Sequence, residues 1–230
     1  MIRVLATGSS GNCYIVETSD ESLILECGIN IKSIMEGLNF DLSKVKGCLI
    51  SHSHSDHSKS VKKILEKSID VFTGEETINE LGIKSHRLHP VYPKLAFKVG
   101  GFTILPFDVQ HDVQCLGYLI YHKETGKILF ATDTYYLKYK FDGCNYVMIE
   151  CNYDEYILHQ LPPWRARIIK SHMSMQTCIE TLKTWNLSKC KNILLIHLSN
   201  DNGDPVKFQK EVQGYTGIET IIAEKGVEIL

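Results

Sequence analysis

Three histidines and one aspartate lie within six residues, in the run His52–His57 with the sequence HSHSDH. Imidazole and carboxylate groups are the usual ligands of catalytic zinc, and they also bind manganese or iron. Alternate side chains of an extended segment share a face, so His52, His54 and Asp56 are expected to converge while His57 points elsewhere. The spacing suits two adjacent ions, with His52 and His54 on one and Asp56 and His57 on the other. The alternative is a polar surface loop in which four ligand-type residues cluster by chance.

His111, Asp133 and His197 each follow an apolar segment with the pattern of a buried strand. A single histidine or aspartate after a strand is more often an ordinary loop residue than a ligand. Together with the segment His52–His57, however, these three residues supply a third imidazole for each ion and a carboxylate that can bridge the two ions. The sequence therefore predicts a dinuclear metal site.

Strands and helices are predicted on either side of the residues that carry this chemistry. Lys46–Ile50 is predicted to be a short buried strand and Val61–Glu66 a helix, which places the histidine-rich segment on the loop between them, where catalytic residues gather. Strands come first and alternate with helices in both halves of the chain, and two β-rich layers covered by helices on both outer faces fit this order. The other predicted helices are Ile31–Leu38, Glu75–Leu81, Met175–Trp185 and Pro205–Val212.

The composition indicates one domain, residues 1–230, in an intracellular protein. The 230 residues are 43% hydrophobic, which suffices for one substantial core. A formal net charge of −2 means that any contact with nucleic acid must come from a local patch or from the metals. The eight cysteines form no C-x-x-C pair and are expected to be buried thiols of a reducing cytosol. No segment resembles a signal peptide or a membrane span, so we expect a soluble, cytoplasmic protein without a membrane partner.

The motifs of the chain resemble those of the metallo-β-lactamase fold superfamily, whose signature is H-x-H-x-D-H followed by distant His, Asp and His. Within it, the chain is similar to the YycJ/WalJ-like group of bacterial and phage hydrolases. The matching stretches cover nearly the whole chain: Thr7–Tyr14, His52–His57, Pro106–Asp112, Thr132–Thr134, Glu150–Asp154, Pro163–Trp164, Arg167–Ile168, His172–Ser174 and His197–Asn202.

This resemblance implies an α/β fold, the αββα four-layer sandwich of the superfamily, with two divalent ions as cofactors. Zinc or manganese is expected, and iron is compatible with the same ligands. An aspartate in place of a cysteine at position 133 argues against a drug-hydrolysing lactamase, and the intact pair Asp56 and His57 argues against a flavodiiron oxygen reductase. The implied ligands are His52, His54 and His111 on one ion, Asp56, His57 and His197 on the other, and Asp133 as the bridge.

The resemblance also implies a phosphodiester hydrolase, most simply a 5′-to-3′ DNA exonuclease that uses a hydroxide held between the metals. Two divalent ions leave the site net cationic, so it attracts a phosphate and can activate water. Nucleic acid, in the first place DNA, or a nucleotide is the expected partner, and a homodimer is compatible with the sequence. The alternatives are a cyclic-nucleotide phosphodiesterase of the kind phages use against host signalling, another hydrolase of this fold, or a binding module that has lost its metals.

His172 is the candidate general acid, and with Asp56 it completes the set of candidate catalytic residues. It precedes the predicted helix Met175–Trp185, so its ring is expected near a helix N-terminus, where anions bind. In the related tRNA 3′-processing nucleases an equivalent histidine assists at the scissile phosphate; the alternative is a capping histidine or one that orients a metal ligand. Ser174, the candidate N-cap, and the basic residues Arg165 and Arg167 are candidate substrate contacts, although a solvated basic face is the simpler interpretation of the two arginines.

The sequence departs from the family pattern at two positions. Glu26 stands where relatives usually carry an aspartate that orients a metal-binding histidine. The extra methylene is either absorbed locally or shifts the ligand. Tyr135 replaces a residue that is usually small, and we expect it to narrow the pocket.

Overall fold

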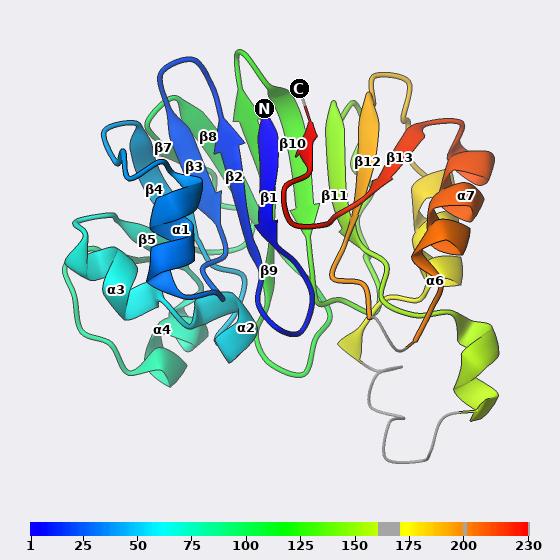
Figure 1. Ribbon diagram of the computed structural model, residues 1–230, viewed down its shortest axis with the longest axis horizontal. Helices are drawn as coiled ribbons and strands as arrows, with labels where there is room; N and C mark the ends of the chain where they lie inside the picture. The colour runs from blue at the N-terminus through cyan, green and yellow to red at the C-terminus, as the bar shows by residue number, and fades with distance from the viewer. Residues whose placement is uncertain (161–170, 200–201, 230) are drawn as a thin grey trace.

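The computed structural model describes residues 1–160, 171–199 and 202–229. Two seven-stranded sheets pack face to face, with helices on both outer faces (Figure 1). Helices α1, α3 and α4 lie beside the first sheet, and α6 and α7 lie beside the second. The predicted αββα sandwich is therefore confirmed.

The first sheet is formed by the N-terminal third of the chain together with the last strand. Its strands lie in the order β14-β1-β2-β3-β4-β5-β6, antiparallel from β14 to β3 and parallel from β3 to β6. Its elements are β1 (Ile2–Ala6), β2 (Cys13–Glu17), β3 (Ser22–Leu25), α1 (Ile31–Gly37), β4 (Val45–Leu49), α2 (Ser55–Ser58), α3 (Val61–Glu66), β5 (Val71–Thr73), α4 (Glu75–Leu81), β6 (Leu88–Pro90) and β14 (Glu228–Ile229).

The second sheet is formed by the remaining strands in the order β13-β12-β11-β10-β9-β8-β7. The pairs from β7 to β10 are antiparallel and those from β10 to β13 are parallel. Its elements are β7 (Phe97–Val99), β8 (Phe102–Asp108), β9 (Leu116–His122), β10 (Gly126–Ala131), β11 (Tyr146–Glu150), the 3-10 helix η1 (Glu155–Gln160), α6 (Met175–Lys183), β12 (Asn192–Ile196), α7 (Pro205–Thr216) and β13 (Glu219–Ile222).

Three apolar clusters hold the layers together. One lies between the sheets, where Tyr14, Phe102 and Phe130 are fully or almost fully buried. A second cluster packs α6 and α7 on the second sheet, and a third packs α1, α3 and α4 on the first. Burial of apolar surface on both faces explains why β3 and β11 are buried along their whole length. All eight cysteines are buried and unpaired, as predicted.

The predicted elements agree closely with the structure, apart from the histidine-rich segment and two strands that were not predicted. Residues 55–58 form the short helix α2 and not an extended chain, so the prediction that His57 points away from Asp56 was wrong. Successive helical residues differ in direction by about 100°, which lets the side chains of Asp56 and His57 both reach the same site. The strands β6 and β13 were not predicted, because each is short and lies near a sheet edge.

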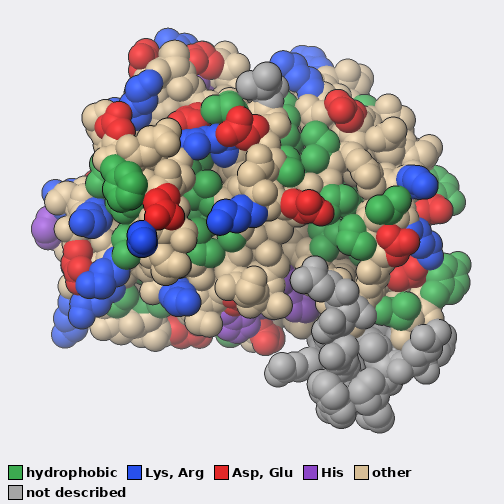
Figure 2. Space-filling model, viewed as in Figure 1, with side chains coloured by type: hydrophobic (Ala, Val, Ile, Leu, Met, Phe, Trp, Pro, Cys, Tyr) green, Lys and Arg blue, Asp and Glu red, His purple; other side chains and the backbone are tan. Residues whose placement is uncertain are grey.

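Several strands end at the same edge of the sandwich. The chain continues from β4 to His52, from β8 to His111, from β10 to Asp133 and from β12 to His197. The carboxyl ends of parallel strands meet at one edge, which is how residues far apart in the sequence come together. None of the helices in the described ranges is long and apolar enough to cross a membrane. Side chains of both charges are interspersed over the face seen in Figure 2, in keeping with the small net charge.

Candidate metal centre

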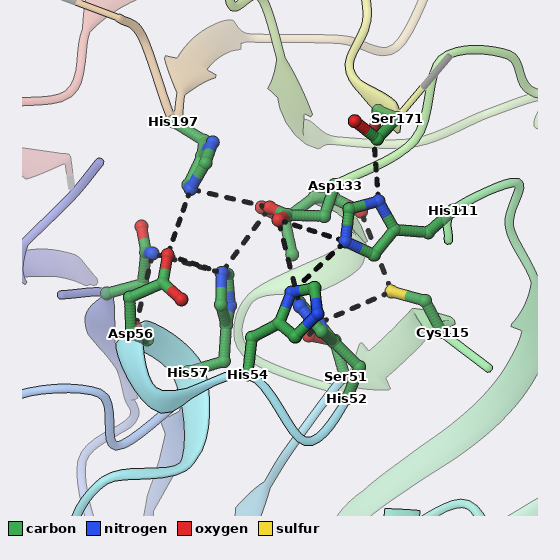
Figure 3. Close-up of polar contacts among 12 residues, drawn as sticks. Ser51, His52, His54, Asp56, His57, His111, Cys115, Asp133, Ser171 and His197 are labelled. Carbon is green, nitrogen blue, oxygen red and sulfur yellow. Dashed lines mark hydrogen bonds and ion pairs between the residues drawn. The ribbon is translucent and has the colours of Figure 1, made fainter. Parts of the chain in front are cut away.

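Seven side chains converge at this edge in two groups that share one residue (Figure 3). The first group is formed by His52, His54, His111 and Asp133, and its potential ligand atoms all lie within 4.8 Å of one another. The second is formed by Asp56, His57 and His197, with Asp133 beside it. The residues proposed as metal ligands from the sequence are thus brought together.

Asp133 lies between the two groups and faces each with a different oxygen. Its Oδ2 lies 3.7 Å from Nε2 of His52 and 3.6 Å from Nε2 of His111. Its Oδ1 lies 3.4 Å from Nε2 of His57 and 3.5 Å from Nε2 of His197. This is the orientation that a bridging carboxylate needs. The backbone φ of Asp133 is +46°, a costly conformation for a residue with a side chain and one that concentrates at functional sites.

The separations between donor atoms fit two ions better than they fit hydrogen bonds. Atoms held about 2.0–2.1 Å from one ion in a tetrahedral arrangement lie about 3.3 Å apart. In the second group, Oδ2 of Asp56 lies 3.3 Å from Nε2 of His57 and 3.5 Å from Nε2 of His197. In the first group, Nδ1 of His54 and Nε2 of His111 are 3.4 Å apart, a pair of imidazole nitrogens that an ion can join.

Hydrogen bonds on the far side of the His111 and His52 rings leave one nitrogen of each ring available to an ion. Nδ1 of His111 lies 2.9 Å from the carbonyl oxygen of Ser171, which can only accept, so this nitrogen carries the proton and Nε2 keeps its lone pair. Nε2 of His52 is buried and has no hydrogen-bond partner among the described residues. A buried polar atom without a partner is costly, and a metal ion would supply the missing interaction.

The electrostatics of the site demand positive charge. Burial lowers the pKa of His52, and the nearby charge of His57 lowers it further. The ring is therefore neutral, as a metal ligand must be. Burial also disfavours charge on His197, yet Asp133, Asp56 and Glu150 together outweigh burial and raise the pKa of His197 to about 10. The carboxylate of Asp133 also raises the pKa of His57 despite its burial. The buried carboxylates therefore favour positive charge in the site, which divalent ions would supply.

Glu26 contacts His57 of the second group directly and His52 of the first group through Ser51. The side chain is fully buried, and its carboxylate accepts the backbone N–H of Ser51 at 3.2 Å. Its Oε1 lies 3.7 Å from Nδ1 of His57. The hydroxyl of Ser51 in turn lies 2.8 Å from Nδ1 of His52. The extra methylene of Glu26 is therefore accommodated, at a backbone φ of +63°, and the prediction that this residue orients a ligand histidine has a geometric basis.

The turn at Gly8–Asn12 braces the second group. The side chain of Asn12 accepts from the backbone N–H of Gly8 at 2.9 Å and donates to the carbonyl of Asp56 at 3.3 Å. Gly28 passes so close to this loop that a Cβ atom there would lie 1.6 Å from the carbonyl oxygen of Asp56. The backbone position of the segment that carries Asp56 and His57, here named the ligand loop, therefore depends on a glycine at position 28.

His172 lies beside the centre and is held by Glu150 at the end of β11. Its Nδ1 is 2.6 Å from Oε1 of Glu150, and its ring stacks on that of His197 at a centroid distance of 5.3 Å. Burial lowers the pKa of His172, but the carboxylates of Glu150 and Asp133 together outweigh burial and raise it. Glu150 was not assigned a role from the sequence. A carboxylate at the end of an otherwise apolar, buried strand was the available signal, since such a charge needs partners.

A third cluster of potential ligand atoms, from Asp133, Glu150, His172 and His197, does not have the character of an additional ion site. The carboxylate of Glu150 is engaged by the backbone N–H groups of Thr134 and Met173 and by Nδ1 of His172. A carboxylate so occupied positions its neighbours and has little capacity left for a metal.

Two further residues near the centre complete the comparison with the sequence predictions. Ser174 caps α6, where its hydroxyl accepts the N–H of Thr177 at 2.9 Å and donates to Glu155, so its contact with substrate stays a prediction. Asp112 was not predicted; its Oδ1 lies 3.0 Å from Nε2 of His111 at the open side of the first group. Arg165 and Arg167 lie outside the described residues.

Comparisons with known proteins agree with this geometry. Residues 32–198 match the family described as the beta-lactamase superfamily domain. The chain is 27% identical to exodeoxyribonuclease YycJ of Bacillus anthracis over 97% of this chain and 89% of that protein. It is 28% identical to exodeoxyribonuclease WalJ of Streptococcus pneumoniae, over 86% of this chain and 81% of that protein.

Solved structures share the fold at low sequence identity. The metallo-beta-lactamase fold protein YhfI from Bacillus subtilis superposes with a TM-score of 0.77 at 17% identity, covering 98% of this chain and 97% of its own. The short form of human tRNase Z superposes with a TM-score of 0.66 at 14% identity, covering 100% and 98%. These likenesses establish the architecture of the two sheets.

Proposed function

The chain belongs to the beta-lactamase superfamily, as a metal-dependent hydrolase, and we propose that it is a dinuclear phosphodiesterase that degrades DNA as an exonuclease. The observation that carries the proposal is Asp133, whose two carboxylate oxygens face two separate groups of ligand-type side chains. The names of the curated relatives, both exodeoxyribonucleases, favour DNA as substrate. A 5′-to-3′ direction follows from the resemblance to that group and is part of the proposal.

Two sets of residues would hold the ions. His52, His54 and His111 would bind one, Asp56, His57 and His197 would bind the other, and Asp133 would bind both. When bound, two divalent ions such as Zn²⁺ or Mn²⁺ supply a hydroxide nucleophile at neutral pH and brace the phosphate oxygens.

In this proposal His172 donates a proton to the leaving oxygen of the cleaved strand. The carboxylate of Glu150 fixes the orientation of the ring through Nδ1, so Nε2 is the nitrogen that remains free to face substrate. The Glu150 carboxylate raises the pKa of His172, which favours the protonated ring that a general acid requires. His172 can act without leaving the metal sites incomplete, because both donor sets are filled by other side chains.

A substrate panel tests the proposal. Protein loaded with Zn²⁺ or with Mn²⁺ would be offered 5′-phosphorylated single-stranded and duplex DNA, structured RNA, cyclic nucleotides and a chromogenic lactam. We expect stepwise release of mononucleotides from the 5′ end of DNA, and no reaction with the lactam. Faster hydrolysis of a cyclic nucleotide than of any DNA would overturn the assignment to DNA, and release from the 3′ end alone would overturn the direction.

A further inference from the structure

The segment that follows Asp133 combines aromatic and basic side chains in the sequence YYLKYK, residues 135–140, here named the Tyr-Lys loop. Tyr135 and Tyr136 are 43% and 47% exposed, and Lys138 and Lys140 are also exposed. Exposure of two large rings side by side is costly in water unless a ligand covers them. The loop therefore presents two aromatic faces and two cations within two to seven residues of the bridging carboxylate.

The Tyr-Lys loop is anchored to the core, so this surface is built and not a loose end. Leu137 is 5% exposed and packs in the cluster beneath α6. The Tyr139 ring meets the Phe107 ring edge-to-face at a centroid distance of 6.0 Å. Anchored and exposed side chains alternate from Tyr136 to Lys140, so Tyr136, Lys138 and Lys140 point outward.

Hydrogen bonds also tie the loop to the metal centre. The backbone N–H of Tyr135 donates to the carbonyl of Gln110, next to His111, at 3.1 Å. The hydroxyl of Thr134 donates to the carbonyl of Tyr136 at 2.7 Å, and the N–H of Thr134 donates to Glu150 at 2.7 Å. The exposed rings are thus fixed relative to Asp133 and Glu150. A ligand that covers these rings would therefore be held at a fixed position relative to the metal centre.

A hollow of about 430 Å³ separates the loop from α6, within the size range of small-ligand sites. Lys138 and Lys140 line one wall, and Gln176 and Glu180 line the other. Glu180 is neutralised by Lys183, whose Nζ lies 2.8 Å away. Among the described residues, by contrast, Lys138 and Lys140 have no ion-pair partner, which leaves their charge available to an anion.

We propose that the Tyr-Lys loop binds a single-stranded segment of DNA, with bases stacked on Tyr135 and Tyr136 and phosphates paired with Lys138 and Lys140; this rests on the proposed nuclease function. Aromatic rings beside cations are the combination that binds single strands without sequence preference. Both faces of a base are accessible only when the base is unpaired and unstacked, so the loop selects a single strand over a duplex.

Binding of a cleavage-resistant probe tests this inference separately from catalysis. The probe is a fluorescent phosphorothioate decathymidylate, and the readout is its anisotropy with the metal-loaded protein. The double variant Tyr135→Ala/Tyr136→Ala should weaken binding at least about tenfold, since stacking on one aromatic ring accounts for about that much. Tyr135→Phe/Tyr136→Phe keeps both ring faces and should bind like the unaltered protein.

The lysines have their own readout. Each phosphate contact contributes about 0.7 to the slope of log affinity against log salt for a single strand, so Lys138→Ala/Lys140→Ala should reduce that slope by about 1.4. The matched control is Tyr121→Ala/Lys123→Ala, an exposed pair at the opposite end of β9, which should leave both affinity and slope unchanged.

The inference would be overturned by no binding of the decamer by the unaltered protein, by equal losses in the control pair, by weak binding by the phenylalanine variant, or by tighter binding of duplex or of oligouridylate. Hydrolysis of bis(p-nitrophenyl) phosphate distinguishes the two levels of the argument. If the metal-loaded protein fails to cleave any phosphodiester, the proposed function fails. If it cleaves them but the alanine variant binds the decamer normally, only the role of the Tyr-Lys loop fails.

Discussion

Oε1 of Glu150 lies 2.6 Å from Nδ1 of His172. The same oxygen lies 3.3 Å from Nδ1 of His197. One fully buried carboxylate therefore orients both the proposed general acid and a proposed metal ligand. Groups that orient a metal-binding histidine in this way commonly affect metal affinity or activity by about 10- to 100-fold.

Glu150→Gln keeps the shape of this side chain and removes its charge. Burial lowers the pKa of His172 and the Glu150 charge raises it, so the variant should have a lower pKa at His172. A general acid is active while protonated, and its contribution is lost as pH rises through its pKa. We expect the alkaline limb of the kcat profile to move to lower pH, with kcat at neutral pH reduced about 10- to 100-fold. Coincident alkaline limbs in the two pH–rate profiles would contradict this assignment.

Asp133→Ala should lower the occupancy of both metal sites, because its two oxygens face different groups. Asp56→Ala should lower the occupancy of the second site alone, since Asp56 approaches only His57 and His197. Elemental analysis after loading with zinc or manganese should give two ions per chain for the unaltered protein and about one for Asp56→Ala. A single ion in the unaltered protein would rule out the dinuclear centre.

Glu26→Gln should reduce metal affinity or activity about 10- to 100-fold while the fold is retained. The carboxylate supports His57 directly and His52 through Ser51, so losses at both sites are expected. Glu26→Asp is the matched control, because aspartate tolerates the left-handed backbone at φ +63° and keeps the charge. Titration with a chelator measures the affinity, and equal affinities for the Gln variant and the unaltered protein would reduce Glu26 to a strand-end residue.

Gly28→Ala should displace the ligand loop, because the new Cβ would overlap the carbonyl oxygen of Asp56. Overpacking of this kind costs about 1–3 kcal/mol of unfolding free energy, and here it should also lower occupancy of the second site. Gly214→Ala in α7 is the control: nothing lies within 4 Å of its Cβ position, and alanine should stabilise the helix by about 0.5–1 kcal/mol. Thermal melts and metal analysis of both variants check the contrast; normal metal content in Gly28→Ala would disprove it.

Much of the fold could be predicted because the local patterns agree with the tertiary structure. The helices Val61–Glu66 and Glu75–Leu81 have the predicted bounds, since their apolar residues pack against a core. Residues 55–58 were mispredicted because alternating polar residues fit an extended chain as well as one helical turn. No periodicity distinguishes the two when the apolar signal is absent.

The candidate site was predictable where residue type alone carries the chemistry, and less so where tertiary contacts do. Histidines and aspartates that follow predicted strands indicate a metal site from the sequence alone. The role of Glu150 depends on which rings lie within 3.3 Å of its carboxylate, and that follows from the meeting of β11, β12 and the segment before α6. The exposure of Tyr136 likewise depends on the anchoring of Leu137, which no local pattern specifies.

His172→Ala separates proton donation from metal binding. Both donor sets are complete without His172, so the variant should keep two ions and a near-normal melting temperature. A nucleotide alkoxide is a poor leaving group, and positioned proton transfer to it is typically worth about 10²- to 10⁴-fold. We expect kcat on DNA to fall by about that factor.

The substrate bis(p-nitrophenyl) phosphate provides the internal control for His172→Ala, because its leaving group is stable as an anion and needs little protonation. The loss on this substrate should therefore be much smaller than the loss on DNA, in steady-state kinetics with either metal. Equal losses on the two substrates would mean that His172 binds the phosphate and is not the acid. Loss of an ion in the variant would instead make His172 a competitor of His197 for the second site. The metal content of the variant must therefore be measured, because the rings of His172 and His197 stack on each other.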